Sequence, residues 1–409
     1  MKFVADFHIH SKYSRATSPQ MEVKTLSETA KYKGISLLGT GDFTHHLWLE
    51  ELKKHLKDSG NGFFEYNGVN FILTAEISSI YSKNDKVRKI HNLIFAPSFK
   101  VVDKINDVLS GYGNLSSDGR PIIGIDAKEL AEVVFGVSKD VFLVPGHIWT
   151  PWFSLFGSKS GFDSIEECFE EYTKDIYALE TGLSSDPGMN WRWSKLDRFN
   201  LISNSDSHSP RKIGREANVF DVEMSYKSVT DALKVKDNKK FLHTVEFFPE
   251  EGKYHYDGHR NCKVRFSPSE TKKNKNTCPV CGKSLTVGVM NRVDTLADRP
   301  EGFVPKGSVP YKRMIPLSEI ISDVLGVGDG SKAVEKEYSA IVPRVGTEFE
   351  VLTEVRKDEL LTKLPKKIAK AIINVRNGNV NILPGFDGEY GKIEILKKED
   401  NSEKQMDLF

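Results

Sequence analysis

The sequence predicts an α/β fold for its first 250 residues, and two observations carry this prediction. Short apolar runs of strand length recur along the chain, and an ionisable side chain stands at the end of most of them. The runs occupy 3–10, 35–42, 69–76, 91–95, 141–147, 176–180 and 201–206, with helical segments and loops between them. This alternation is typical of a barrel or a wound sheet, in which the carboxyl ends of parallel strands meet. We therefore expect the ionisable side chains to share one pocket.

The 409 residues are enough for two or three domains, and 39% hydrophobic with 28% charged residues is the composition of a soluble globular enzyme. No apolar run approaches the ~20 residues of a membrane span. The N-terminus shows no basic stretch followed by an apolar one, so no secretory signal is expected. We predict a cytoplasmic, nucleoid-associated monomer without a membrane partner.

Changes in composition divide the chain into four predicted parts. An α/β unit covers 1–250, and a basic module with three of the four cysteines covers 251–299. A mixed, partly helical C-terminal domain is predicted over 300–396, after a Pro/Gly-rich linker, and a flexible charged tail over 397–409.

Charge is unevenly distributed along the chain. The 58 basic and 57 acidic residues give a net charge of +1, which by itself argues against a nucleic-acid partner. Between 260 and 292, however, eight basic residues stand against one acid. Such a segment suits a DNA-backbone surface, and its alternative is an ordinary solvated face. The predicted DNA-contacting side chains are Arg260, Lys263, Arg265, Lys272, Lys273, Lys275 and Lys283.

Histidines and carboxylates at the strand ends point to a metal centre. In the first run, a strand period of two puts Asp6, His8 and His10 on one face. Similar side chains at or just beyond the ends of later runs are Asp42, His45, Glu76, His91, His147, Asp206 and His208. Any one of these histidines could be structural, but the set suits Zn, Mn or Fe(II), and a carboxylate such as Glu76 can bridge two ions. Paired divalent ions activate water for hydrolysis of a P–O bond.

This set resembles the PHP (polymerase and histidinol phosphatase) family, whose fold is a distorted (βα)7 barrel. The resemblance implies two or three divalent ions (Zn²⁺, Mn²⁺ or Mg²⁺) and a catalytic role for Glu76, Asp206 and His208. The first ion would be held by His8, His10, Glu76 and Asp206, and the second by Glu76, His91 and His147. Phe43 and Ala16 replace two usual ligands of a third ion. That third site would then depend on Asp42, His45 and His208.

The basic module carries the spacing of a four-ligand structural zinc site. Its ligands would be His259, Cys262, Cys278 and Cys281, with His255 as the alternative to His259. One Zn²⁺ there would fold a segment that has little core of its own.

The chain ends in Gln405-Met406-Asp407-Leu408-Phe409, which resembles the pentapeptide by which bacterial repair proteins dock on the sliding clamp. The resemblance implies clamp binding through Gln405, Met406, Leu408 and Phe409. The alternative is a tail whose apolar residues are accidental.

Motifs along 1–395 together resemble the endonuclease Q family. They lie at 14–18, 39–45, 180–187, 254–262, 278–283 and 291–299. The resemblance implies a DNA-repair endonuclease that cuts double-stranded or single-stranded DNA on the 5′ side of uracil, hypoxanthine, xanthine or an abasic site. The alternatives are a small-molecule phosphatase like the histidinol-phosphate branch, and a non-enzymatic, clamp-tethered DNA-binding scaffold.

An enzyme acting beside a damaged base needs flat apolar walls and hydrogen-bonding groups to receive it. The loops after His147 and Glu180 supply candidates for such a lesion pocket: Trp149, Trp152, Ser184, Ser185, Asn190, Trp191 and Trp193. The alternative for the tryptophans is packing in the core.

Overall fold

A computed structural model of the chain describes residues 1–395. Its centre is an eleven-stranded mixed sheet with the order β15-β12-β11-β1-β2-β5-β4-β3, while β6, β7 and β8 branch from β5 and β6. These strands are β1 (Lys2–Asp6), β2 (Leu37–Gly39), β3 (Lys57–Asp58), β4 (Phe64–Tyr66), β5 (Val69–Lys83), β6 (Lys86–Ala96), β7 (Ile122–Ile123), β8 (Phe142–Pro145), β11 (Ala217–Asp221), β12 (Phe241–Glu246) and β15 (Tyr311–Arg313).

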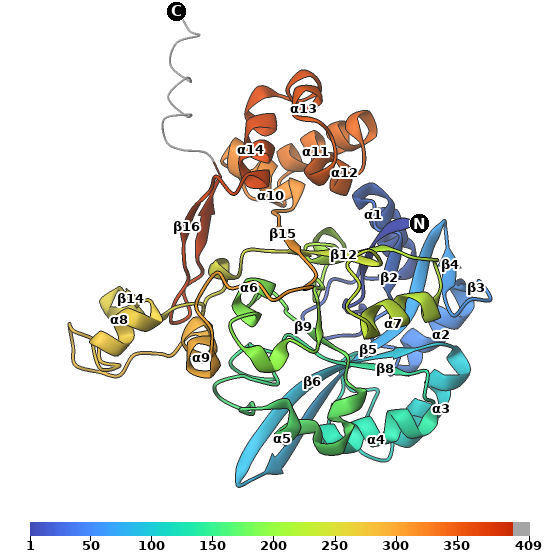
Figure 1. Cartoon of the computed structure of the whole chain (residues 1–409). Helices are drawn as coiled ribbons and strands as arrows, with labels where there is room; N and C mark the ends of the chain where they lie inside the picture. Colours follow the sequence, from blue (N-terminus) through green and yellow to red (C-terminus); the bar gives the residue numbers. More distant parts are fainter. Residues whose placement is uncertain (396–409) are drawn as a thin grey trace, which may run out of the picture.

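Helices flank this sheet, as Figure 1 shows. They are α1 (Val23–Lys33), α2 (His46–His55), α3 (Phe99–Leu109), α4 (Ala127–Val137), α5 (Ile165–Phe169), α6 (Pro187–Asn190) and α7 (Tyr226–Lys234). Short 3-10 turns cover Glu170–Asp175, Ser194–Leu196, Pro210–Lys212, Pro249–Glu251 and Arg260–Cys262. Local chemistry sets several boundaries: the side chains of Ser98 and Asp126 cap α3 and α4, and α1 ends at left-handed Gly34.

Parallel pairing brings the first strands to a common end. β1 pairs with β2 and β2 with β5, all in parallel, so that residues beyond Asp6 and Gly39 lie near the middle of β5. A separate parallel pair, β9 (Ala178–Glu180) and β10 (Asn200–Ile202), joins this end through the backbone bond from Ile148 to Glu180. The bridge between Ile9 and Ser207 links β1 to the segment after β10. Polar side chains from distant segments therefore meet at one edge.

The mixed α/β architecture is confirmed, but the strands are not uniformly parallel. β5 and β6 form a long antiparallel hairpin because only Asn84 and Asp85 separate them, both left-handed as two-residue turns require. β6–β8 and β1–β11 are also antiparallel. The ladders of residues 1–395 do not close into one hydrogen-bonded ring, so the (βα)7 barrel stays a prediction.

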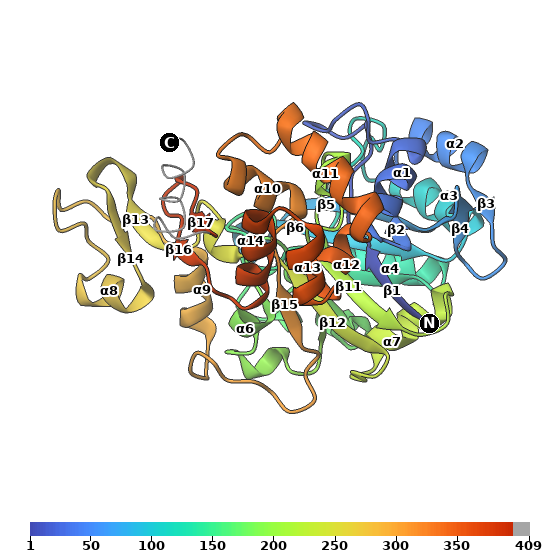
Figure 2. The ribbon, with the colours of Figure 1, turned by 90° about the horizontal axis from the view of Figure 1, so that it is seen from above.

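The region after 250 contributes a small module and a helical unit. The module contains β13 (Asp257–His259), β14 (Val264–Phe266), α8 (Pro268–Lys273) and α9 (Val289–Leu296). The C-terminal helical unit consists of α10 (Leu317–Leu325), α11 (Lys332–Val345), α12 (Glu348–Thr353), α13 (Lys357–Lys363) and α14 (Lys366–Arg376). Figures 1 and 2 show the hairpin of β16 (Asn381–Leu383) and β17 (Lys392–Glu394) extending from this unit toward the module.

A buried ion pair attaches the helical unit to α1. Lys33 Nζ lies 2.9 Å from an oxygen of Glu348, and both side chains are almost fully buried. Glu348 also accepts hydrogen bonds from the Tyr338 hydroxyl (2.7 Å) and the Leu317 amide (2.9 Å), so its charge is well satisfied. Among residues 1–395, no helix has the length and apolarity that crossing a bilayer demands.

Candidate metal centre

The predicted ligands gather at the edge where β1, β5, β8 and β10 meet. His8 and His10 follow β1, Glu76 and His91 come from the hairpin, and His147 and Asp206 follow β8 and β10. They form two groups, and within each group the donor atoms all lie within 4.8 Å of one another. The first group is His8, His10, Glu76 and Asp206, and the second is Glu76, His91 and His147.

Glu76 belongs to both groups because its two oxygens face different partners. Oε1 lies 2.6 Å from His91 Nδ1 and 3.1 Å from His147 Nε2. Oε2 lies 3.2 Å from His10 Nε2 and 3.4 Å from His8 Nε2. Burial disfavours the charged carboxylate, yet His91, Arg120 and His8 outweigh this and hold the pKa of Glu76 well below its usual range. This placement suits a bridging carboxylate.

Two outer carboxylates orient the first pair of histidines. Glu180 Oε1 lies 3.0 Å from His8 Nδ1 and accepts a hydrogen bond from the Asn204 amide group at 2.8 Å, while Glu180 Oε2 accepts one from the His147 backbone amide at 2.8 Å. Asp42 Oδ1 lies 3.0 Å from His10 Nδ1. Such contacts fix the proton on Nδ1 and leave Nε2 free for a cation.

One buried nitrogen supports this interpretation. His8 Nε2 makes no hydrogen bond within the described part of the chain, although the side chain is only 1% exposed. A buried nitrogen that faces carboxylate oxygens without forming a hydrogen bond is costly, and a divalent ion between them would satisfy it. The donors present therefore fit divalent cations.

The residues predicted for a third ion take other positions. Asp42 uses Oδ1 for His10 and Oδ2 for the Ser11 amide and the Ser11 and Ser14 hydroxyls, so it orients a ligand. His45 stacks on Tyr13 at 4.6 Å. His208 packs against the His10 ring, with the ring centroids 4.6 Å apart and the planes tilted by 48°. None of these three belongs to a ligand group within residues 1–395, so the structure does not support a third site.

Sequence reasoning missed Arg120. Its Nη1 lies 3.1 Å from Glu76 Oε2, and its side chain is 30% exposed beside the ligand groups. The residue before it is Gly119, where a Cβ would lie 2.2 Å from Asp42 Oδ2, and the sequence alone does not show this contact. The role of Glu180 was also missed, although its place at a strand end was recognised.

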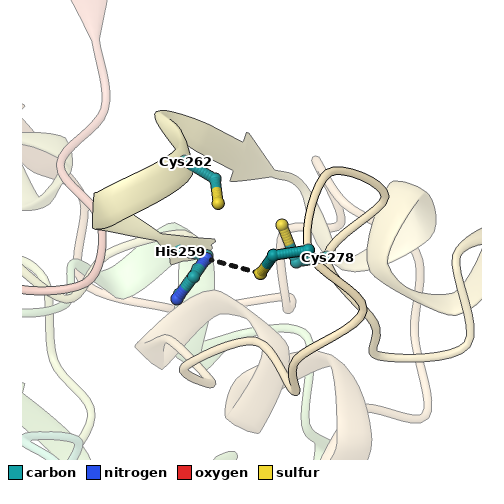
Figure 3. Close-up of side chains that lie close together, drawn as sticks. His259, Cys262 and Cys278 are labelled. Atoms are coloured by element: carbon teal, nitrogen blue, oxygen red, sulfur yellow. Dashed lines mark hydrogen bonds between the residues drawn. The ribbon is translucent and has the colours of Figure 1, made fainter.

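The four predicted zinc ligands of the module also lie close together. The donor atoms of His259, Cys262, Cys278 and Cys281 form one group, and His259 Nδ1 lies 3.4 Å from Cys281 Sγ. Figure 3 shows His259, Cys262 and Cys278 around a common space. His255 instead is buried against Tyr256, which favours His259 as the fourth member.

The basic side chains of the module face solvent. All seven predicted DNA contacts, Arg260, Lys263, Arg265, Lys272, Lys273, Lys275 and Lys283, are exposed. Lys263 pairs with Glu389 and Lys272 with Asp294, both at 2.6 Å. The cationic surface is therefore available, although part of its charge is compensated.

Most residues of the predicted lesion pocket lie in packed positions instead. Trp149 and Trp193 are buried against Phe156, and Trp149 donates to Asn190 at 2.7 Å. Ser185 and Asn190 are also buried, and Trp191 packs on Tyr311. Of the predicted pocket residues, Trp152 and Ser184 line a cavity.

That cavity has a volume of about 280 Å³ and lies beside the second ligand group. Trp152 and Tyr254 meet edge to face at 5.8 Å, and Leu183 and Tyr390 complete apolar walls. Thr150, which also lines it, has its hydroxyl 3.1 Å from His147 Nδ1. One side chain thus separates the aromatic cavity from a candidate ligand.

The fold and the two groups sharing Glu76 define a metal-dependent hydrolytic enzyme. Two solved structures match the whole chain with a TM-score of 0.86. The lesion-specific endonuclease PfuEndoQ from Pyrococcus furiosus is 35% identical, with 98% of this chain and 99% of that one covered. Endonuclease Q in complex with a 27-mer duplex carrying an abasic lesion at the active site is 34% identical, with both chains fully covered. The chain belongs to the endonuclease Q family.

Two sequence relatives also match this chain. Uncharacterized protein YqxK of Bacillus subtilis strain 168 is 30% identical over 412 residues, which cover 96% of this chain and 99% of that protein. Uncharacterized protein MJ0043 of Methanocaldococcus jannaschii is 38% identical over 255 residues, which cover 60% of this chain but only 31% of that protein. The family described as "MJ0043 C-terminal domain" matches residues 316–379.

We expect Glu180→Gln to weaken binding of the ion in the first group about tenfold, because His8 loses the charge that orients it and raises its basicity. Calorimetric titration of the metal-free protein with Mn²⁺ measures this. Glu171→Gln, a change of an exposed carboxylate in the 3-10 turn Glu170–Asp175, is the matched control. Equal affinity in Glu180→Gln and wild type would contradict the prediction.

Proposed function

We propose that this protein is a DNA-repair endonuclease that hydrolyses the phosphodiester on the 5′ side of a deaminated base or an abasic site. The observation that carries the proposal is the pair of ligand groups joined through Glu76, in a chain similar over its full length to a nuclease crystallised with an abasic lesion at its active site. Uracil, hypoxanthine and xanthine are the proposed bases.

The residues of the centre have different roles at the scissile phosphate. His8, His10, Glu76 and Asp206 would hold one divalent ion, and Glu76, His91 and His147 the other. Such a pair, when bound, lowers the pKa of a water molecule and stabilises charge on the phosphate. Glu180 and Asp42 keep the His8 and His10 rings in place, and buried Glu76 fixes the spacing between the groups.

Arg120 is suited to bind the phosphate itself. Its guanidinium is held beside the ligand groups by Glu76 while part of it remains exposed. A guanidinium offers a rigid fork of donors to phosphate oxygens and stays charged at any working pH. We assign Arg120 to binding and orienting a non-bridging oxygen of the substrate.

The aromatic cavity is suited to receive the damaged nucleotide. Trp152 and Tyr254 offer flat faces for stacking, and Ser184 offers a hydroxyl to a base edge. The cavity adjoins His147 through Thr150, so a base placed there would put its backbone near the ligand groups. At an abasic site the DNA backbone would follow the same course past the ligand groups, but no base would stack in the cavity.

The basic module supports duplex binding and argues against a small-molecule phosphatase. Seven exposed cations surround the zinc group, and phosphomonoester hydrolysis gives them no role. We also propose the four-part division at 250, 299 and 396, a PHP-type barrel around the metal centre, and action as a monomer on the nucleoid. The clamp motif Gln405, Met406, Leu408 and Phe409 lies outside the described residues, and clamp tethering remains part of the proposal.

We expect the protein to nick a labelled duplex with a single deoxyuridine or deoxyinosine on the 5′ side of the lesion. Asp206→Asn should lower the rate about 100-fold or more, because it removes a charged ligand of the first group. A denaturing gel with and without chelator measures this. Equal cutting of an undamaged duplex, no cutting of either duplex, or full activity of Asp206→Asn would refute the assignment.

Trp152→Ala should weaken binding of the deoxyuridine duplex about tenfold, because base–aromatic stacking is worth ~1–3 kcal/mol. Fluorescence anisotropy with lesion and undamaged duplexes measures it. Trp152→Phe keeps an aromatic face and is the matched control. If both duplexes weaken equally with Trp152→Ala, the cavity does not receive the base.

Deleting 405–409 should abolish retention on an immobilised sliding clamp while leaving nicking of short duplexes intact, since none of the predicted metal ligands is among these residues. A pull-down measures retention. Replacing Leu408 and Phe409 by Ala should act like the deletion, and replacing Asn401 and Ser402 by Ala should have no effect. Unchanged retention after the deletion would refute clamp docking.

A further inference from the structure

The loop at 205–215, here called the Asp206 loop, carries a ligand in an unfavourable backbone conformation. Asp206 has φ of +47°, in the left-handed region that side chains other than glycine rarely adopt. Such a conformation persists only where surrounding contacts fix the chain. The position of Asp206 in the first ligand group therefore depends on what holds this loop.

Asp6 holds the loop from inside. Its carboxylate is fully buried and accepts hydrogen bonds from the Ser205 hydroxyl (2.6 Å), the Ser205 amide (3.1 Å) and the Gly214 amide (2.7 Å). The two ends of the loop are thereby tied to one side chain. The His10 amide adds a bond to the Ser207 carbonyl at 2.9 Å.

The C-terminal helical unit holds the loop from outside. Lys212 Nζ lies 2.6 Å from Glu319 Oε1 on α10 and 3.0 Å from Asp329 Oδ2. Arg211 reaches Asp329 at 3.1 Å, and Arg215 reaches Glu319 at 3.5 Å. Three cations of one short segment thus face two acids of the helical unit, with Lys212 at the centre.

Two features make this contact more than a surface ion pair. The side chains of Lys212 and Glu319 are 31% and 16% exposed, so solvent screens them less than it would a fully exposed pair. The loop also closes directly on the helical unit, because a Cβ on Gly214 would lie 3.1 Å from Phe349 of α12. A shift of the unit must therefore move the loop.

We propose that the C-terminal helical unit positions Asp206 for metal binding, with Lys212 as the positioning residue. The family match over 316–379 covers both of its acidic partners, Glu319 and Asp329. Because linkage is reciprocal, an ion in the first group tightens docking of the helical unit by the same factor. The inference rests on the proposed role of Asp206 as a ligand.

The test compares Lys212→Glu with wild type in the full chain. Calorimetric titration of the metal-free protein with Mn²⁺ should show the first-group ion bound about threefold to tenfold more weakly, with the second ion and the zinc group unchanged. Amide hydrogen exchange of the metal-free protein should become faster at 205–214. Lys212→Arg should retain both properties, and Lys212→Met replaces Lys212→Glu if the latter fails to fold.

Lys227→Glu is the matched control, because Lys227 is an exposed cation that pairs with Asp231 of its own helix. Unchanged Mn²⁺ affinity in Lys212→Glu, or an equal loss in Lys227→Glu, would overturn the inference. Failure of the proposed function looks different: wild type would then cut neither duplex, or would cut the lesion duplex and the undamaged duplex equally, whatever the Mn²⁺ affinity of Lys212→Glu.

Discussion

The metal centre depends on a single buried carboxylate shared by two sets of donors. Each oxygen of Glu76 faces one pair of histidine nitrogens, so any shift of β5 changes both ligand groups together. In a buried site, charges interact strongly and unpaired ones are costly. This explains why Arg120 and the histidines surround Glu76. It also explains why the outer carboxylates Glu180 and Asp42 contact the far nitrogens of the His8 and His10 rings. The long β5–β6 hairpin supplies the rigidity that such a centre needs.

The supports of this centre come from distant parts of the chain. Glu180 lies 172 residues from His8 in sequence, and Asp6 holds Ser205 across 199 residues. The C-terminal helical unit reaches the Asp206 loop across 107 residues, between Lys212 and Glu319. Each of these contacts restrains a ligand whose position the strand before it does not fix completely. The ligand geometry therefore belongs to the assembled fold, and the helical unit is part of that assembly.

The sequence predicted the site residues whose side-chain chemistry and position along the chain both indicate a metal ligand. Histidines and carboxylates at strand ends converged because parallel strands share an end, and the cysteine spacing brought four donors together. It could not predict features set by tertiary contacts. Asp42 has the same residue type and strand-end position as a ligand, and only its 3.0 Å contact with His10 shows that it orients one. Trp149 and Trp152 stand three residues apart in one loop, yet one is buried against Phe156 and the other lines the cavity. The antiparallel pairing of β5 and β6 was missed because the apolar pattern of a buried strand is the same for parallel and for antiparallel pairing.

The near-zero net charge conceals two populations of charge that act on different partners. Several acids are buried, and their carboxylates interact with histidines, backbone amides and the cations of the centre. Examples are Asp6, Asp42, Glu76 and Glu180. The cations between 260 and 283 are exposed and meet solvent. A polyanion approaching the protein responds to the exposed charges, because the buried carboxylates are already neutralised by their partners. Bound divalent ions would make the centre more positive again. The same chain can therefore be neutral in total and still present a positive surface on the basic module.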